Sequence, residues 1–207
     1  MSTSHPGDRF VLASQSPARL ATFRSAGIEP RVVVSGVDES QVTDTDPATV
    51  ALRLADLKAA AVVARVQPAD TSWVLGCDSV LELAGEALGK PDGADEARAR
   101  WRAMRGRSGV LHTGHCLVEV TTSRRVLRTV GTTVHFAEVS DSEIDAYVAS
   151  GEPLHVAGAF TVDGLGGAFV RGLEGDPHNV VGVSLPAVRE MFAELGVRWT
   201  DLWNLVS

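Results

Sequence analysis

Trp73-Val74-Leu75-Gly76-Cys77 is an uncharged apolar run that ends on a carboxylate, Asp78. A short apolar run of this length, bounded by polar residues, predicts a buried strand. A second strand is expected directly after it, over residues 80–83. Because a carboxylate between two apolar runs is costly to bury without a purpose, we assign a function to Asp78 before any other acidic residue.

The segments around this run alternate between predicted strands and helices. Ser16-Pro17 and Asp46-Pro47 each pair a capping residue with proline at the first helical position, which predicts two helix starts. Two β-rich runs, 109–120 and 125–136, predict a hairpin. The other expected elements are strands at 9–13, 31–34 and 168–173, helices at 94–104, 140–150 and 186–195, and a loop at 174–179. This order predicts an α/β fold with a mixed sheet flanked by helices.

The composition is typical of a globular chain, with 44% hydrophobic and 22% charged residues. Its 207 residues are expected to form one domain spanning residues 1–207. The formal net charge of −7 argues against a polymeric nucleic acid as partner, because proteins that bind one are usually basic. No stretch approaches the roughly 20 apolar residues of a membrane span, and the first ten residues lack a signal core, so we expect a cytoplasmic protein without membrane contact. The two cysteines lie in apolar runs, which favours buried free thiols.

Lysine is rare in this chain. Of the nineteen lysine and arginine residues only two are lysine: Lys58 in an Ala/Leu-rich helical stretch, and Lys90 in a Gly-Lys-Pro loop. A lysine ammonium is a compact point charge on a flexible stem and is well suited to a phosphate. Since the two lysines flank Asp78 in the sequence, they suggest a site for a phosphorylated ligand and its metal. The alternative is chance, because an arginine-rich chain must place its few lysines somewhere.

Four further residues could contribute to such a site. Ser14 and Arg19 lie where a predicted strand meets a helix N-terminus, whose free N–H groups and dipole favour a phosphate oxygen, although Ser-Pro is also a common helix start. Glu39 and Asp78 could supply hard oxygen ligands to Mg²⁺, but Glu39 could equally be a solvated loop charge. Arg107 could contact phosphate, or could simply complement the dipole at a helix C-terminus.

Seven segments in sequence order resemble the Maf family of nucleoside triphosphate pyrophosphatases, relatives of the inosine-triphosphatase-like superfamily. Each segment alone is a weak signal, but together they span nearly the whole chain. The segments are 12–19 (LASQSPAR), 37–39 (VDE), 53–59 (RLADLKA), 76–80 (GCDSV), 89–91 (GKP), Gly106-Arg107 with Thr113-Gly114, and 157–160 (AGAF) with Gly164.

The resemblance implies metal-dependent hydrolysis of a nucleoside triphosphate between its α and β phosphates, with Mg²⁺ or Mn²⁺ as cofactor. The products would be a monophosphate and pyrophosphate, and the role would be the removal of modified or non-standard nucleotides. The family fold implies an elongated mixed sheet with a central cleft between two lobes, and commonly a homodimer. The matching positions give Asp78 as the base and metal ligand, Glu39 as a second metal ligand, and Ser14, Arg19, Lys58, Lys90 and Arg107 as substrate-binding residues.

Three positions depart from the family pattern: Ala18, Ser79 and Asp163. Family members that prefer dTTP and UTP resemble Arg, Thr and Gln at these positions, and those that prefer 7-methyl-GTP resemble Trp, Gln and Glu. This chain matches neither set. An ionised Asp163 only accepts hydrogen bonds and so suits the donor edge of a guanine.

Two other function classes fit the same residues. One is a nucleotide-binding regulator of cell division with reduced catalysis, and the other is a sugar-nucleotide transferase. The joint presence of Asp78, Glu39, Lys58 and Lys90 favours catalysis over regulation, because a binding protein has less need of a base. Release of pyrophosphate without an acceptor would exclude the transferase.

Overall fold

Residues 6–204, described by a computed structural model, form a mixed seven-stranded sheet with the strand order β2-β1-β3-β5-β6-β7 and with β4 paired to β3. Strand β1 is parallel to β2 and β3, and the other pairs are antiparallel. The strands are β1 (Phe10–Ala13), β2 (Arg31–Val32), β3 (Trp73–Leu83), β4 (Glu86–Leu88), β5 (Ser108–Glu119), β6 (Arg125–Phe136) and β7 (Val170–Glu174). The predicted α/β class and mixed sheet are confirmed.

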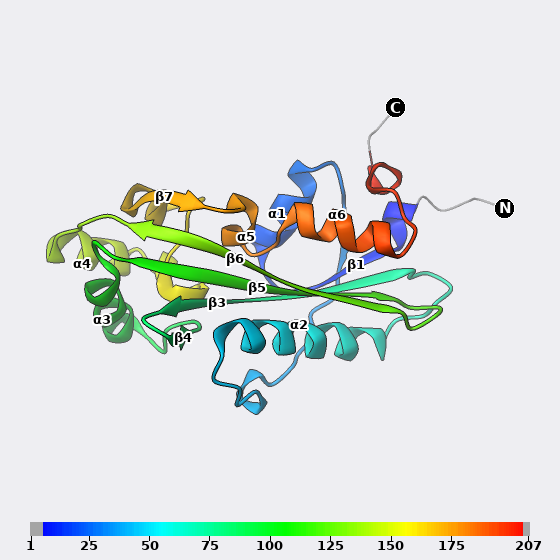
Figure 1. Cartoon of the computed structure of the whole chain (residues 1–207), viewed down its shortest axis with the longest axis horizontal. Helices are drawn as coiled ribbons and strands as arrows, with labels where there is room; N and C mark the ends of the chain where they lie inside the picture. The colour runs from blue at the N-terminus through cyan, green and yellow to red at the C-terminus, as the bar shows by residue number, and fades with distance from the viewer. Residues whose placement is uncertain (1–5, 205–207) are drawn as a thin grey trace.

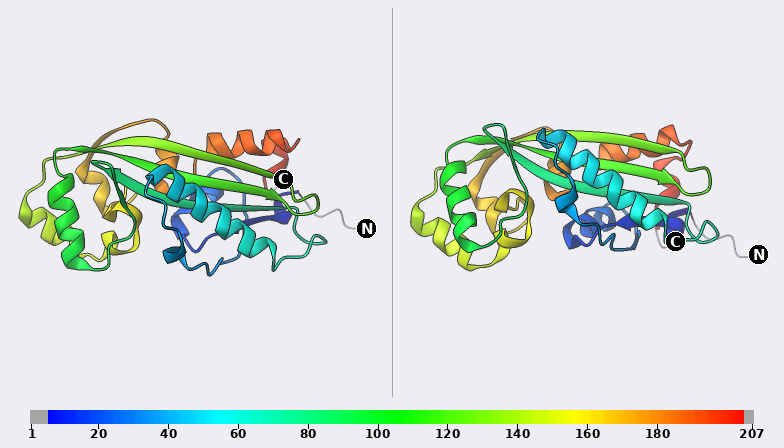
Figure 2. Two further views of the ribbon diagram at one scale, coloured as in Figure 1. Left: turned by 60° about the horizontal axis from the view of Figure 1, so that its bottom comes forward. Right: turned by 90° about the horizontal axis from the view of Figure 1, so that it is seen from below.

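Helices flank this sheet on both sides (Figures 1 and 2). Helix α2 lies along one face, α1 and α6 lie on the other, and α3 and α4 lie at one end of the elongated molecule (Figure 1). The α-helices are α1 (Pro17–Ser25), α2 (Pro47–Val63), α3 (Ala94–Met104), α4 (Asp141–Ala149), α5 (Pro177–Val181) and α6 (Leu185–Glu194). The short 3-10 helices are η1 (Pro6–Arg9), η2 (Glu39–Gln41), η3 (Glu152–His155), η4 (Ala157–Ala159), η5 (Leu165–Phe169) and η6 (Trp199–Leu202).

Side-chain caps explain where the helices begin. Ser16, Asp46 and Ser140 each accept a hydrogen bond from a backbone N–H in the first turn of the helix that follows. Asp176 does the same for α5, so part of the predicted loop at 174–179 is helical. The Asp176-Pro177 pair repeats the signature that predicted α1 and α2, and this signal was missed.

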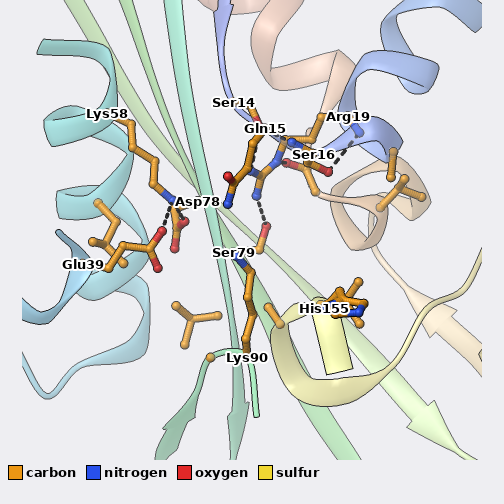
Figure 3. Close-up of a pocket in the computed structure, with 18 of the residues that line it drawn as sticks. Ser14, Gln15, Ser16, Arg19, Glu39, Lys58, Asp78, Ser79, Lys90 and His155 are labelled. Atoms are coloured by element: carbon orange, nitrogen blue, oxygen red, sulfur yellow. Dashed lines mark hydrogen bonds and ion pairs between the residues drawn. The ribbon is translucent and has the colours of Figure 1, made fainter. Parts of the chain in front are cut away.

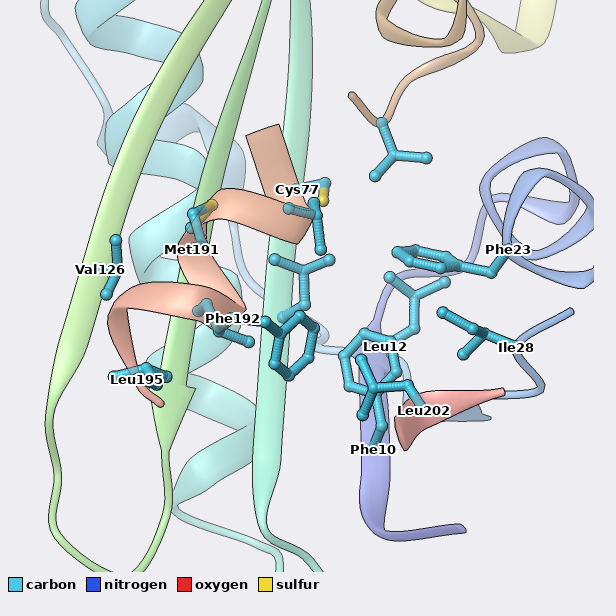
Figure 4. Close-up of a cluster of buried hydrophobic side chains, with 14 residues drawn as sticks. Phe10, Leu12, Phe23, Ile28, Cys77, Val126, Met191, Phe192, Leu195 and Leu202 are labelled. Carbon is cyan, nitrogen blue, oxygen red and sulfur yellow. The ribbon is translucent and has the colours of Figure 1, made fainter. Parts of the chain in front are cut away.

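The hydrophobic core divides along the sheet. One cluster lies between the sheet, α1 and α6 and includes Phe10, Phe23 and Phe192 (Figure 4). A second cluster surrounds Trp101 at the α3 and α4 end, and a third, smaller one lies under α2. The sheet therefore connects two separately packed ends, which fits the expected two lobes; a single domain over residues 1–207 stays a prediction.

Strand β3 is longer than the sequence suggested. The two predicted strands at 73–77 and 80–83 form one strand, because β5 pairs with β3 continuously from Trp73 to Glu82. Asp78 lies opposite Gly114 in this ladder, so it projects from the middle of a strand and not from a strand end. Strand β2 is shorter than predicted, at Arg31–Val32.

Two glycines allow α2 to lie unusually close to the sheet. A Cβ added to Gly76 would lie 2.1 Å from the carbonyl oxygen of Ala55, and one added to Gly114 would lie 2.3 Å from that of Ala51. Only glycine leaves room for a backbone that approaches so closely. This close packing brings the next turn of α2, which carries Lys58, over β3.

Two further expectations concern the cysteines and the membrane. Cys77 and Cys116 are buried free thiols, as predicted, and burial raises the pKa of Cys77 to about 12. Within residues 6–204, no helix has the length and apolar character needed to cross a bilayer.

Candidate active site

A pocket of about 710 Å³ opens where β1, α1, α2 and β3 meet the loop after β4 (Figure 3). Nine of the ten candidate residues from the sequence line it: Ser14, Ala18, Arg19, Glu39, Lys58, Asp78, Ser79, Lys90 and Asp163. These residues come from segments far apart in the sequence. The fold therefore gathers almost the whole predicted site in one cavity.

Lys58 joins the two candidate metal-binding carboxylates. Its ammonium lies 2.7 Å from Oε1 of Glu39 and is also hydrogen-bonded to Oδ1 of Asp78. The side chains of Lys58 and Asp78 are only 11% and 12% exposed, whereas that of Glu39 is 45% exposed. Two acidic groups therefore converge on one cation in the pocket.

The pKa values of the two carboxyl groups are shifted in opposite directions. Burial raises the pKa of Asp78, and this effect outweighs the opposing charges of Lys58 and Arg19. Burial also acts to raise the pKa of Glu39, but the hydrogen bond and charge of Lys58, with smaller contributions from Lys90 and Arg19, hold that pKa below its usual range. The environment thus separates an ionised Glu39 from an Asp78 that takes up a proton more readily.

Arg19 is held by three partners at the start of α1. Its Nε donates to the carbonyl of Gly182 at 2.7 Å, one terminal nitrogen donates to Ser14 Oγ at 3.3 Å, and the other donates to Ser79 Oγ at 3.0 Å. Ser14 Oγ also accepts the backbone N–H of Ser16. A guanidinium fixed in this way can present its remaining N–H groups to an anion without further ordering.

Ser79 acts as a support for Arg19. Its hydroxyl accepts from Arg19 and contacts the Thr113 hydroxyl at 2.9 Å, and Thr113 donates in turn to the carbonyl of Asn179. Asn179 is fully buried and its amide nitrogen donates to the Leu111 and Val130 carbonyls. Sequence reasoning quoted Thr113 in a family segment without giving it a role and missed Asn179, because the link between them exists only after β5 and α5 have packed together.

Lys90 projects into the pocket from the loop after β4 (Figure 3). Among the described residues its ammonium has no hydrogen-bond or ion-pair partner. The loop itself is held in place, since Arg100 and the N–H of Gly158 both donate to the carbonyl of Gly89. Lys90 therefore presents an unpaired ammonium from a loop whose backbone is held by hydrogen bonds.

The far wall of the pocket is less charged. Phe160, Thr161, Asp163 and His155 line it from the segment that follows α4, and His155 lies across the cavity from Lys58 (Figure 3). Ala18 lines the pocket from the first turn of α1. The pocket thus combines cationic groups with a partly apolar lining.

A family model described as "Maf-like protein" matches residues 9–195. The chain belongs to the Maf family. This Maf chain is 59% identical over 198 residues to a "Nucleoside triphosphate pyrophosphatase" of Salinispora tropica, covering 95% of this chain and 88% of that protein. It is 56% identical over 201 residues to a protein of the same name from Streptomyces coelicolor, covering 97% of each.

A solved structure of a nucleoside-triphosphatase (dITP/XTP pyrophosphatase) from Mycobacterium abscessus overlaps this Maf chain more loosely. The two share 17% identity and a TM-score of 0.39, over 63% of this chain and 75% of the other. This likeness is too distant to inform the site.

Arg107 is the one candidate of this Maf chain that lies outside the pocket lining. Gly106 turns the chain back after α3 with a φ of +69°, and the Arg107 guanidinium donates to the Ala103 carbonyl at 3.3 Å. Its guanidinium therefore donates a hydrogen bond to a carbonyl at the C-terminal end of α3. A role at this helix end was the alternative that the sequence left open. Its assignment to the substrate stays a prediction.

The two carboxylates that meet at Lys58 are candidate ligands for a divalent metal. Glu39 and Asp78 both lie within contact of one cationic atom, so their oxygens converge, and carboxylate oxygen is the ligand that Mg²⁺ and Mn²⁺ prefer. Across residues 6–204 no cluster of three or more His, Cys, Asp or Glu side chains has a metal-binding arrangement. Magnesium is commonly held by one or two carboxylates together with phosphates and water, so this pair fits such an ion.

Proposed function

We propose that this chain is a nucleoside triphosphate pyrophosphatase that hydrolyses the bond between the α and β phosphates. The observation that carries the proposal is the convergence of Lys58, Lys90 and Arg19 with Asp78 and Glu39 in one pocket. Its relatives at 56% and 59% identity bear that enzyme name over nearly their full lengths. Modified or non-standard nucleotides would be its substrates.

The cationic residues would bind the triphosphate. Lys90 offers an unpaired ammonium, Arg19 offers N–H groups that its three supports leave free, and the first turn of α1 offers backbone N–H groups and a positive dipole end. Lys58 would exchange part of its contact with the carboxylates for a phosphate oxygen. Together these groups neutralise most of the charge of the triphosphate.

Glu39 and Asp78 would hold a divalent cation with the help of the phosphates. Such a cation, Mg²⁺ or Mn²⁺, lowers the pKa of bound water and offsets charge on the phosphates. The mostly ionised state of Glu39 suits this task, because a metal ligand must be deprotonated.

Asp78 would accept the proton from the attacking water. A bond forms between the water oxygen and the α phosphorus, the bond from that phosphorus to the bridging oxygen breaks, and the electron pair leaves with pyrophosphate. The nucleoside monophosphate is the second product. A carboxyl group whose pKa is raised by burial is a stronger base than an ordinary aspartate once it is ionised.

The test is a nucleotide panel of standard and modified triphosphates, assayed separately for pyrophosphate and phosphate with Mg²⁺, with Mn²⁺ and with chelator. We expect pyrophosphate and monophosphate in equal amounts, without any acceptor, and no turnover with chelator. Nucleotide binding without turnover would support the regulator instead, and orthophosphate as the sole product would reject the proposed bond. The expected cytoplasmic location and homodimer stay predictions.

A further inference from the structure

A second hollow adjoins the candidate active site. It has a volume of about 350 Å³ and shares three lining residues, Ala18, Asp163 and Val181, with the larger pocket. Small residues of α1 form one wall, and α5 with the start of α6 forms the other. Its remaining lining residues are Ala21, Thr22, Ser25, Ala26, His178 and Leu185. The two cavities therefore meet at a gate formed by Ala18, Asp163 and Val181.

This gate lies beside both parts of the active site: Ala18 is next to Arg19 on the first turn of α1, and Asp163 belongs to the wall that would take the nucleotide base. Lys58, Glu39 and Asp78 lie together on one side of the pocket, and His155 lies across the pocket from Lys58 (Figure 3). Phe160 lines the pocket from the segment that follows His155. An apolar aromatic surface suits a base, whereas the phosphates follow the cations. This step rests on the proposed function.

Ala18 leaves the gate open. Its side chain is a single methyl group on the first turn of α1, and Ala21, Ser25 and Ala26 continue the same wall with equally small side chains. A large residue at position 18 would fill the space between the two cavities. With alanine there, a substituent on the base has a continuous path from one cavity to the other.

Asp163 gives the gate a negative charge. Among residues 6–204 it has no hydrogen-bond or ion-pair partner, and neither lysine nor arginine lines the second hollow. An ionised carboxylate there can only accept hydrogen bonds. It therefore favours a substituent that donates a hydrogen bond or carries a positive charge.

The segment that contains Asp163 is held in place by hydrogen bonds to the carboxylate of Glu152. That group accepts from the Tyr147 and Thr161 hydroxyls and from the backbone N–H groups of Leu165 and Gly166. A Cβ on Gly164 would lie 2.6 Å from the Glu152 carboxylate. The residues before and after Asp163 are thus both anchored to Glu152. The fold therefore fixes the backbone position of Asp163 at the gate.

We propose that the second hollow is a subsite for a substituent on the nucleotide base. The substituent that fits has an apolar body, to lie against Ala21, Val181 and Leu185, and a hydrogen-bond donor or cation that reaches Asp163. The substrate class is therefore nucleoside triphosphates whose bases carry an added group of several heavy atoms.

The test compares pyrophosphate release from parent nucleotides and from derivatives with extended bases. Suitable pairs are UTP with aminoallyl-UTP, ATP with ATP that bears an aminohexyl group on its exocyclic nitrogen, and the hexyl analogue without the amine. We expect kcat/KM for the extended amine of at least one pair to equal or exceed that of its parent. If every extended derivative is about tenfold poorer than its parent, the subsite is overturned although the proposed function stands.

Variants that fill the second hollow show whether the preference for an extended base depends on this hollow. Ala21 and Ser25 line the second hollow and not the active-site pocket, so Ala21→Phe and Ser25→Trp should lower kcat/KM for the extended nucleotide about tenfold and change that for the parent less than about twofold. Arg24→Phe is the matched control, because Arg24 lies on the same helix but lines neither cavity. Equal changes for both nucleotides, or none in either variant, would reject the subsite.

One further variant tests the charge at the gate. Asp163→Asn keeps the shape of the side chain and removes its charge, so it should lower turnover of the amine derivative relative to the hexyl analogue. If the ratio of turnover between the amine derivative and the hexyl analogue is unchanged, Asp163 does not bind the amine. Failure of every nucleotide to release pyrophosphate would overturn the proposed function and, with it, this inference.

Discussion

The ammonium of Lys58 is hydrogen-bonded to the carboxylate of Asp78, and both side chains are almost nine-tenths buried. A buried charge that loses its partner is strongly destabilising. Lys58→Met should therefore lower the free energy of unfolding by about 3 kcal/mol, measured by urea denaturation.

A double-mutant cycle separates this pairing from a general packing defect. The double variant Lys58→Met with Asp78→Asn should be less destabilised than the sum of the two single variants, because neither charge is then left alone. Strict additivity would show that the pair contributes no coupling energy.

Asp78→Asn should nearly abolish turnover while triphosphate binding persists. The amide keeps the shape of the carboxyl group but cannot accept the proton from water, so kcat should fall by about a thousandfold. Pyrophosphate release gives the rate, and calorimetry with a non-hydrolysable triphosphate gives the binding. Turnover at the wild-type rate would reject Asp78 as the base.

Gly76→Ala should disturb the active site through α2, because Gly76 and Asp78 lie on the same face of β3, the face that α2 covers. The added methyl group would lie 2.1 Å from the Ala55 carbonyl oxygen, so α2 must move away from the sheet and take Lys58 with it. We expect a loss of at least about 2 kcal/mol in stability, together with a fall in kcat. Gly93→Ala is the control, since a Cβ there meets no atom within 4 Å. Equal behaviour of the two variants would contradict the close-packing argument.

His115 should make the fold sensitive to acid. Burial, with the charge of Arg19, lowers its pKa from 6.5 to about 4, and its Nε2 accepts the backbone N–H of Ser184. Between these two pH values the unfolded chain binds a proton that the folded chain does not. Stability that is fully present above pH 6.5 is therefore lost as the pH falls toward 4, by up to about 3 kcal/mol. The unfolding free energy of His115→Gln should fall less over this range, and parallel pH curves for the two proteins would disprove the assignment.

Glu152→Gln should loosen the wall around Asp163. A glutamine places an NH₂ group where one carboxylate oxygen accepts a backbone N–H, so the segment loses part of its support. We expect a stability loss of roughly 1–2 kcal/mol and weaker discrimination between nucleotides. Glu190→Gln, an exposed change on α6, is the control. If the kcat/KM ratios between nucleotides stay as in the wild type, the network supports folding alone.

Local signals in the sequence predicted most of the elements correctly. The caps at Ser16, Asp46 and Ser140 marked three helix starts, because capping depends on neighbours only a few residues away. The break expected between 77 and 80 was wrong, because the continuity of β3 depends on its pairing with β5. Pairing between distant segments leaves no local signature.

The same contrast between local signals and tertiary contacts applies to the candidate site. The rarity of lysine and the apolar setting of Asp78 pointed to residues that the fold does bring together. The hydrogen-bond chain from Arg19 through Ser79 and Thr113, and the anchoring of the far wall by Glu152, arise only from tertiary contacts. Arg107 differs from the other candidates, since the motif match assigned it to the site but its guanidinium donates to the Ala103 carbonyl outside the pocket lining.

The position of water attack is the most direct test of the proposed chemistry. Hydrolysis in water labelled with heavy oxygen, followed by mass spectrometry of both products, identifies the phosphorus that is attacked. If the pocket directs water to the α phosphorus, the label is found in the nucleoside monophosphate and not in pyrophosphate. Label in pyrophosphate, or in orthophosphate released from the end of the chain, would contradict it.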